Sequence, residues 1–426
     1  MMSNLYRNAA EHEVENGITF TEEVILQTLH AIYDQQIDTH KQIDAQLFDQ
    51  IHKAFDRAIS VGVKEQPVDN SFMQELKTNN GVFAAFKTHR MQNDMAHQLL
   101  DDKGKLKSFQ QFRSDVQDIV SHHRDAWLRT EYDTAIKRAR KAAQMRQFIN
   151  ERDVLPNLRW LPSTALNPRE EHIPFYDHVW PMDSPFWDDH QPGDAWGCQC
   201  DWEATDDPVT DNTGLDAPSI LPDKGLRGNP AKSGHLFSHD HPYFPDSCSL
   251  CPFNTSQLSI FSNKIKDCYN CHNVTEAVQI ARTEHRKALD IVYKEVRHRI
   301  VATFGYDSVV ALPIGKFGGS GKLKVTPVGL RNCLKVHLHT RTEESKQVLF
   351  AALLHPEELR HNSRKLLGET KDMNDPSDVK NVAKKRDRGV VAYNYYEFRY
   401  NGALWILGFE EVKNGYEQPY FIAQKK

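Results

Sequence analysis

A chain of 426 residues with 39% hydrophobic and 26% charged residues is longer than one hydrophobic core usually supports, and it is too apolar to be disordered. No apolar run approaches the roughly 20 residues of a membrane span, and residues 1–7 lack the apolar segment of a signal peptide. We therefore expect several domains, in a protein that is soluble where it is made and that has no membrane partner.

The net charge of −5 is unevenly divided along the chain. Residues 311–426 contain 20 Lys and Arg against 13 Asp and Glu, or +7, which leaves −12 for residues 1–310. This asymmetry predicts a basic C-terminal module attached to an acidic body. Nucleic acid, either RNA or DNA, is the partner that such a module would attract.

Residues 19–150 are predicted to be helical almost throughout. An apolar stripe follows helical spacing over 43–59 and ends at Gly62. Capping-box spacings mark further helix starts, the last at Ser108, and we expect that helix to continue to about Asn150. Its basic residues are interpreted as a solvated face: Lys137, Arg138, Arg140, Lys141 and Arg146.

After Pro156 the composition changes, and the sequence becomes rich in aromatic residues, prolines and predicted loops. Such a segment cannot pair all its backbone N–H and C=O groups in regular helices or sheets. Its aromatic rings are therefore expected to pack onto the preceding helices. Residues 205–219 are acidic and rich in Asp, Pro and Thr, which predicts a linker. A capping box at Asn273 predicts a helix to about Ala302 that joins the body to the last domain.

From Ala311 onward the pattern is typical of a small α+β domain on an antiparallel sheet. Leu334, Val336 and Leu338 alternate with polar residues, which predicts a half-buried strand. The Asn401-Gly402 pair predicts the turn of a hairpin. The other predicted elements are a helix at 345–354, a polar loop at 369–388, hairpin strands over 396–409 and a last strand at 420–422.

Six of the seven cysteines lie between residues 159 and 272. The pairs Cys248/Cys251 and Cys268/Cys271 read C-x2-C, sixteen residues, C-x2-C, a spacing typical of a four-thiolate zinc site. Two disulfides or four buried thiols are the alternatives. The seven cysteines suit a reducing cytoplasm with zinc better than a secreted disulfide framework.

A second group consists of Arg169, His172, Cys198 and Cys200. The histidine and the two thiolates supply three possible metal ligands, with Asp194 or His178 as a conceivable fourth. The alternative is a hydrogen-bonded core in which Arg169 holds backbone carbonyl groups and the thiols are buried.

The predicted strand near residue 337 carries the clearest hint of chemistry. Strand alternation would place His337, His339 and Arg341 on one face. Two imidazoles can divide acid and base work at neutral pH, and an arginine suits a phosphate, so these residues fit metal-free RNA cleavage. The candidates to complete the site are Arg399 and Tyr395 of the hairpin and His355, Arg360 and His361 after the helix. The alternative is a solvated strand face with a basic surface.

Five stretches in the middle of the chain occur in a specific order and spacing. They are residues 127–132 (Trp-Leu-Arg-Thr-Glu-Tyr), 156–164, Arg169 with His172, 185–188 (Pro-Phe-Trp-Asp) and 196–200 (Trp-Gly-Cys-Gln-Cys). Together they resemble the phage Mu protein F-like head morphogenesis family of minor capsid proteins, over about residues 83–202. Residues 191–194 depart from the family pattern, which has a double proline before Trp-Gly-Cys.

The C-terminal part resembles the phage-associated branch of the barnase/RelE-like RNA-cutting superfamily in its architecture and element order. Together the two resemblances imply a minor head protein that acts near the portal in capsid assembly or DNA packaging and carries an endoribonuclease effector. The implied partners are portal and capsid proteins and an immunity protein. The implied locations are the bacterial host cytoplasm during assembly and the virion head interior near the portal, with ejection into the host together with the DNA.

Two other functions remain open. One is a polymorphic-toxin-type RNase that the head domain delivers. The other is a non-enzymatic nucleic-acid-binding cargo protein, for which the basic C-terminal module would suffice.

The sequence thus predicts a multi-domain protein with a mainly α N-terminal body, an irregular Cys-rich zinc segment and a C-terminal α+β domain. The expected divisions are an N-terminal helical region at 1–82, a head morphogenesis domain at 83–204, a linker and zinc knuckle at 205–275, a bridging helix at 276–310 and a nuclease or toxin domain at 311–426.

Overall fold

A computed structural model describes residues 22–66, 68–121, 123, 127–215, 220–254, 267–337, 342–369, 371 and 373–425. The chain forms two compact units, Met1–Thr283 and Glu284–Lys426. It is therefore a multi-domain protein that combines helices with two separate sheets. No described helix is both long and apolar enough to cross a membrane.

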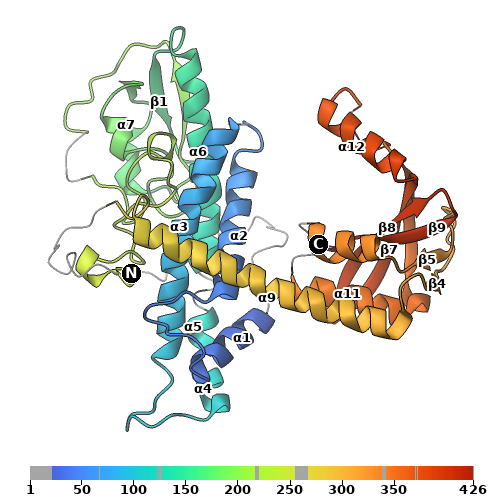
Figure 1. Ribbon diagram of the computed structural model, residues 1–426. Helices are drawn as coiled ribbons and strands as arrows, with labels where there is room; N and C mark the ends of the chain where they lie inside the picture. The colour runs from blue at the N-terminus through green and yellow to red at the C-terminus, as the bar shows by residue number, and fades with distance from the viewer. Residues whose placement is uncertain are drawn as a thin grey trace. The chain divides into compact units, whose positions relative to one another are not determined.

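Three long helices form the framework of the first unit (Figure 1). The helices of this unit are α1 (Glu22–Tyr33), α2 (Ala45–Gly62), α3 (Asn70–Ala96), α4 (Phe109–Asp115), α5 (Gln117–Ser121) and α6 (Leu128–Glu151). Side chains of Asp44 and Asp69 cap α2 and α3 by accepting hydrogen bonds from backbone N–H groups. A Cβ atom at Gly62 would lie 2.5 Å from the Ile136 carbonyl oxygen, so only glycine permits this close approach of α2 to α6.

The helix expected from Ser108 to Asn150 is divided into α4, α5 and α6. The interpretation of its basic residues as a solvated face is also wrong for two of them. Arg138 and Lys141 are 0% and 1% exposed. The Arg138 guanidinium donates hydrogen bonds to four backbone carbonyl groups, those of Gly193, Leu226, Gly228 and Leu236.

A small antiparallel sheet, in the order β2-β1-β3, follows the helices. It consists of β1 (Asn157–Leu161), β2 (Val179–Pro181) and β3 (Asp201–Thr205), and shorter elements around it are η3 (Glu170–Phe175), α7 (Phe186–Asp189), α8 (Pro230–Ser233) and η4 (Cys248–Leu250). The expected aromatic packing is present. Trp160 stacks on Trp187 with ring centroids 6.3 Å apart, and the Trp202 indole donates a 3.0 Å hydrogen bond to Gln144 of α6.

The described part of the expected linker is hydrogen-bonded to this sheet. The Val179 N–H of β2 donates to the Thr210 hydroxyl, and the Asn212 amide donates to the Val179 carbonyl, each at 2.9 Å. The expected helical, aromatic and knuckle segments accordingly belong to one compact unit. The helix expected from Asn273 to about Ala302 is confirmed as α9 (His272–Phe304), whose residues are divided between the two units.

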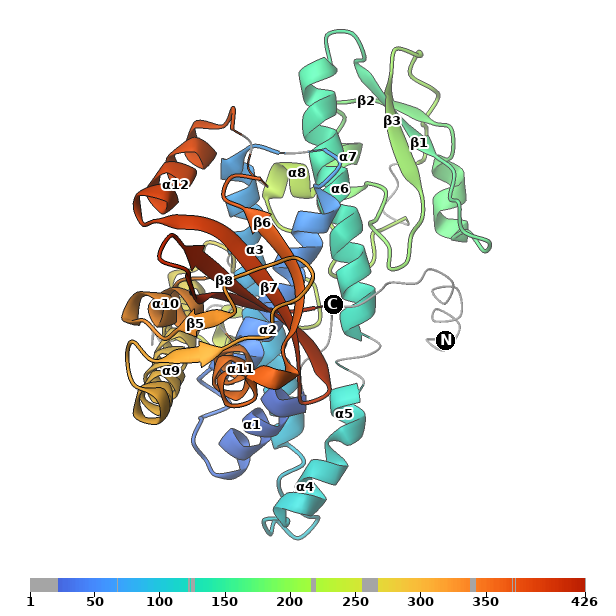
Figure 2. The ribbon, with the colours of Figure 1, turned by 90° about the vertical axis from the view of Figure 1, so that its right-hand side faces the viewer.

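The second unit is built on a six-stranded sheet in the order β4-β5-β9-β8-β7-β6 (Figure 2). Its strands are β4 (Val309–Ala311), β5 (Lys322–Lys324), β6 (Arg360–Leu366), β7 (Val390–Tyr400), β8 (Ala403–Val412) and β9 (Tyr416–Gln424). The helical elements are α10 (Pro327–Arg331), η6 (Asn332–Val336), α11 (Glu343–Leu354), η8 (Pro356–Glu358) and α12 (Pro376–Asp387). The pair β5–β9 is parallel, so the sheet is mixed rather than purely antiparallel as predicted.

Strand alternation gives this sheet two chemically different faces. Tyr396, Leu407 and Ile422 are neighbours across β7, β8 and β9 and belong to the core that Val348 and Leu349 of α11 help to form. We call this side the core face. The alternate positions, such as Tyr395, lie on the opposite side, which we call the outer face.

Local predictions in the second unit had mixed outcomes. The hairpin and the last strand are confirmed as β7, β8 and β9, and both turn residues, Asn401 and Gly402, have positive φ as a two-residue hairpin turn requires. The strand expected at 334–341 is wrong over its described residues, because 332–336 form one π-helical turn. The expected polar loop contains α12, which Asp375 caps and Pro376 begins.

Candidate functional site

The first unit contains a buried group of three possible metal ligands, His172, Cys198 and Cys200. His172 comes from η3, and the two cysteines immediately precede β3, the strand that pairs with β1. The His172 Nδ1 atom lies 3.5 Å from each sulfur. All three side chains are buried, so the ligand atoms converge away from solvent.

Asp194 fixes the orientation of the His172 ring. One carboxylate oxygen lies 3.1 Å from His172 Nε2, and the other lies 2.9 Å from His190 Nδ1. In the neutral tautomer of His172, with the proton on Nε2 next to this carboxylate, the Nδ1 lone pair faces the two sulfurs. A carboxylate behind a histidine is the usual way in which proteins orient a metal ligand.

The electrostatics of the group favour a thiolate at Cys198. Its pKa lies well below the ordinary value because the Cys200 thiol and His172 hydrogen-bond to the sulfur and Lys137 is nearby. Burial lowers the pKa of His172, but Asp194 and Cys198 outweigh burial and raise it to about 10. Burial also opposes ionisation of Asp194, yet its hydrogen bonds with His172 and His190 lower its pKa overall.

The separation of the ligand atoms fits a tetrahedral ion. Metal–sulfur and metal–imidazole bonds of about 2.3 Å and 2.1 Å place sulfur and nitrogen roughly 3.6 Å apart at a tetrahedral angle. The observed distance from His172 Nδ1 to each sulfur is 3.5 Å. The group could therefore hold a metal ion with three protein ligands.

Arg169 lies beside this group and does not belong to it. Its guanidinium donates to the Trp196 carbonyl and lies 3.6 Å from the Asp223 carboxylate. The sequence-based alternative had Arg169 holding backbone carbonyl groups, and the structure places it in that role. The two thiols and His172 still converge, so the group could also hold a metal ion.

The four cysteines of the predicted knuckle form two matching turns. The Cys251 N–H bonds to the Cys248 carbonyl and the Cys271 N–H bonds to the Cys268 carbonyl, each at 3.3 Å. The intervening residues 255–266 lie outside the described residues. Unlike the His172 group, these four described cysteines do not place three ligand atoms within 4.8 Å of one another.

The knuckle cysteines are nevertheless close enough to affect one another. Burial raises the pKa of Cys268 to about 12, and the three other thiols add to this effect. Burial likewise raises the pKa of Cys251 to about 11, but backbone hydrogen bonds from Phe253 and Asn254 act in the opposite direction. N–H groups directed at a sulfur stabilise a thiolate, so these two N–H groups offset part of the effect of burial on Cys251.

In the second unit, the outer face of the sheet carries a buried carboxylate. Glu410 of β8 is 0% exposed. Its carboxylate pairs with Lys385 of α12 and, at 2.8 Å, with Arg388, and it accepts a 3.2 Å hydrogen bond from Gln418 of β9. We call these four residues the Glu410 cluster. A buried carboxylate with two cationic partners is an arrangement for holding charge in a fixed place.

Aromatic rings border the Glu410 cluster. The Lys385 ammonium lies 3.9 Å from the centroid of the Tyr420 ring, and the centroid of Tyr393 lies 5.2 Å from that of Tyr420. Burial lowers the pKa of Lys385 although Glu410 counteracts it, and burial raises the pKa of Tyr420 to about 12. The cluster is thus partly shielded from water, which strengthens its electrostatic interactions.

The predicted catalytic residues are only partly brought together. The π-helical turn η6 removes the strand on which they were placed, but His337 at its end contacts Tyr420 with ring centroids 4.3 Å apart. His339 and Arg341 lie outside the described residues. Arg399 lies on the outer face six positions along β7 from Tyr393, the partner of Glu410, which is about 20 Å. His337 therefore contacts a ring that borders the Glu410 cluster, whereas Arg399 is distant from the cluster.

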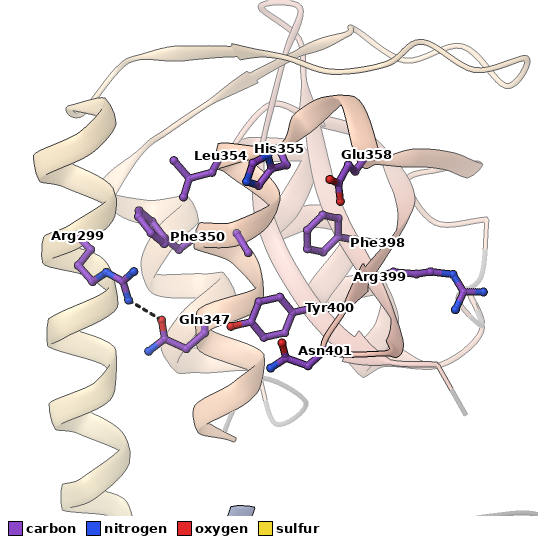
Figure 3. A pocket seen from close by; sticks show the side chains of 11 residues that line it. Arg299, Gln347, Phe350, Leu354, His355, Glu358, Phe398, Arg399, Tyr400 and Asn401 are labelled. Atoms are coloured by element: carbon purple, nitrogen blue, oxygen red, sulfur yellow. Dashed lines mark hydrogen bonds between the residues drawn. The ribbon is translucent and has the colours of Figure 1, made fainter.

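Arg399 borders a pocket at the other end of β7 (Figure 3). The Arg299 guanidinium stacks 4.2 Å above the Phe350 ring and donates a 3.0 Å hydrogen bond to Gln347. The Arg399 side chain points away from the other side chains that line the pocket. His355, at the rim, belongs with Glu357 and Glu358 to an exposed group that could also hold a metal ion.

A second polar group lies on the core face of the sheet. Its member Glu411 follows Glu410 in the sequence, but its side chain lies on the opposite face. Glu411 forms a two-point ion pair with Arg364 and accepts a hydrogen bond from Asn394. Glu417 is 0% exposed and accepts hydrogen bonds from the Tyr396 hydroxyl. Both carboxylates of this group have hydrogen-bond partners, as expected of a structural network.

Glu410, Lys385 and Arg388 were not predicted from the sequence as site residues. The signal available for Glu410 was its position directly after Phe409, the last apolar residue of the hairpin strands predicted over 396–409. No signal links it to Lys385, because that contact joins two elements that are 25 residues apart.

Comparison with known proteins finds no matching family model, no matching curated protein and no matching solved structure.

Proposed function

We propose that the second unit is a metal-independent endoribonuclease whose active site is the Glu410 cluster. The observation that carries this proposal is the buried Glu410 carboxylate, held on the outer face between Lys385 and Arg388, with the His337 ring against Tyr420 at the border of the cluster. Cleavage of RNA without a metal requires a base, an acid and a cation for the phosphate, and these side chains supply all three.

In the proposed reaction, the Glu410 carboxylate takes the proton of a ribose 2′-hydroxyl, and the 2′-oxygen attacks the adjacent phosphorus. Lys385 and Arg388 stabilise the negative charge that develops on the phosphate oxygens. The bond from phosphorus to the 5′-oxygen breaks, and His337 gives that oxygen a proton. The products are a 2′,3′-cyclic phosphate and a 5′-hydroxyl, so the protons and bonds balance.

The test is an RNA cleavage assay with the full chain in excess EDTA. We expect single-stranded RNA to be cut into fragments that end in a cyclic phosphate, because no step requires a divalent ion. Mass spectrometry of the products identifies the ends. Cleavage that requires Mg²⁺ would contradict the proposed chemistry. Binding of RNA without cleavage would favour the nucleic-acid-binding cargo alternative.

We also propose a role in the phage head for the first unit, as its resemblance to minor capsid proteins implies. The resemblance is supported by the packing of its separate stretches into one core. Trp160, from residues 156–164, stacks on Trp187, and Arg169 donates to the carbonyl of Trp196. The protein should then be present in purified virions and bind portal protein, which quantitative mass spectrometry of intact heads would measure.

Zinc is the ion that we propose for both cysteine groups of the first unit. Thiolates with one imidazole, and four thiolates, are the ligand sets that zinc prefers in tetrahedral sites. His172, Cys198 and Cys200 would hold one ion. Cys248, Cys251, Cys268 and Cys271 would hold the other. Zinc would act there by tying distant loops together.

The purified protein is expected to contain two zinc ions per chain by elemental analysis. Cys200→Ser should remove one ion and Cys268→Ser should remove the other, because each substitution deletes a ligand from a different group. Cys333→Ser is the matched control, since Cys333 is buried in the core of the second unit and both groups belong to the first unit. A metal-free parent whose thiols all react under native conditions would contradict the zinc proposal.

A further inference from the structure

Four aromatic side chains lie together on the outer face of the second unit's sheet. They are Tyr393, Tyr395, Tyr420 and Phe421, which we call the aromatic strip. The ring centroids of Tyr395 and Phe421 are 5.8 Å apart, and those of Tyr420 and Phe421 are 6.2 Å apart. The four rings are half-buried and lie outside the hydrophobic core that packs on the opposite face. Core formation therefore does not account for them.

Gly408 makes room for the strip. It lies between Tyr395 and Phe421 in the register of β7, β8 and β9. A Cβ atom at this position would be 2.1 Å from Cδ1 and 2.3 Å from Cε1 of Phe421, so the Phe421 ring occupies the space of the missing side chain. Glycine in the middle of a strand is unfavourable and often marks a close approach. Here the approach is made by a ring on the outer face.

A β-bulge in β9 brings the Tyr420 ring into the aromatic strip. The register between β8 and β9 shifts after Gly408, so β9 has one residue, Tyr420, with no partner in β8. A bulge re-aims side chains, and Tyr420 contacts Tyr393 while its neighbour Phe421 contacts Tyr395. Two consecutive rings thus share the face that contains the Glu410 cluster.

Cationic side chains accompany the strip. Lys385 lies directly over the Tyr420 ring, and Arg388 borders the same cluster. On the neighbouring strand β6, the register places Lys365 opposite Tyr393, on the outer face, and its side chain is exposed. Rings with cations beside them are the usual surface for single-stranded nucleic acid, because unpaired bases stack on the rings and the phosphates meet the cations.

We propose that the aromatic strip binds the unpaired bases of single-stranded RNA on either side of the bond to be cut. The proposal rests on the proposed nuclease function for the choice of RNA. Gly408 is two positions from Glu410 along β8, so bases on Tyr395 and Phe421 lie about 7 Å from the position of the carboxylate. Paired bases present no free faces, so duplex RNA is a poor ligand for this surface.

The experiment measures binding by the full chain with Glu410→Gln, which keeps the RNA intact. Fluorescence anisotropy gives Kd for a labelled 12-nucleotide single strand and for the same strand annealed to its complement. We expect the single strand to bind at least tenfold more tightly. Phe421→Leu and Tyr395→Leu, which retain apolar volume, should each weaken single-strand binding by about five- to a hundredfold.

Tyr306→Leu is the matched control, because Tyr306 is a more exposed aromatic residue of the same unit outside the sheet, and it should leave Kd unchanged. Circular dichroism of each variant shows whether it folds. If a strip variant unfolds, Gly408→Ala, which displaces the Phe421 ring, takes its place with the same expected loss.

The outcomes separate this proposal from the nuclease function. The proposal that the aromatic strip binds unpaired bases would be wrong if the strip variants bound the single strand as tightly as the parent does. It would also be wrong if the parent preferred the duplex. Both conclusions hold even if RNA is cleaved. Loss of single-strand binding in the strip variants, with no cleavage by the unsubstituted chain, would support the strip and overturn the nuclease. Unchanged RNA binding together with loss of a bound protein partner would assign the strip to that partner instead.

Discussion

Glu410→Gln is expected to lower the rate of RNA cleavage by about 10²–10⁴-fold, because the amide cannot accept the proton of the 2′-hydroxyl. The substitution keeps the size of the side chain in its fully buried position. Its partners Lys385 and Arg388 are 20% and 37% exposed, so their charges can be hydrated when the carboxylate is lost. Single-turnover cleavage of a fluorophore–quencher RNA measures the rate, and circular dichroism checks the fold.

Glu411→Gln is the matched control. Glu411 is the next residue of β8 and has the same side chain, but it lies on the core face and pairs with Arg364. Its substitution should leave the rate of cleavage nearly unchanged. Equal losses in both variants would point to damage of the sheet rather than loss of a base. A Glu410→Gln enzyme as fast as the parent would show that Glu410 is not the base.

Elements with strong local signals could be predicted from the sequence. The Asn401-Gly402 pair fixes a hairpin because its two residues readily adopt positive φ, and the structure has both in that region. The apolar stripe that ends at Gly62 gives α2 within a few residues, since the glycine is required where α2 meets α6. In each case, neighbours in sequence determine the conformation.

The predicted strand at residue 334 failed because two periodicities coexist there. Leu334, Val336 and Leu338 alternate as in a strand, but Leu330, Cys333 and Leu334 also follow the i, i+3, i+4 spacing of a helix. The structure buries the second set and leaves Val336 49% exposed. Burial in the core with α11 decided between the patterns, and no local signal reports that contact.

The candidate sites also differ in whether a local sequence signal or a tertiary contact reveals them. The convergence of His172 with Cys198 and Cys200 could be suspected from residue types, because few other roles bring a histidine and two thiols together. The Glu410 cluster could not, since a carboxylate and basic residues with no shared motif are typical of solvated surfaces. Only the pairing of β8 with β7 and the position of α12 show that Glu410 is buried.

Arg138→Met is expected to destabilise the first unit by more than about 4 kcal/mol, because four buried carbonyl groups lose their donor and each unsatisfied group costs about 1–3 kcal/mol. The guanidinium joins α6 to the carbonyls of Gly193 and of three residues between 226 and 236. It also lies near Asp194, the residue that orients His172. Loss of Arg138 should therefore release metal from the His172 group as the loops separate.

Guanidinium denaturation of the full chain, followed by tryptophan fluorescence, measures the free energy of unfolding. Arg152→Met is the matched control, since Arg152 follows the same helix α6 but is exposed, and its substitution should change stability by less than about 0.5 kcal/mol. An Arg138→Met protein as stable as the control would mean that the four carbonyl groups find other donors, such as water. In that case the loops that contain Gly193 and Leu236 would not depend on Arg138 for their position.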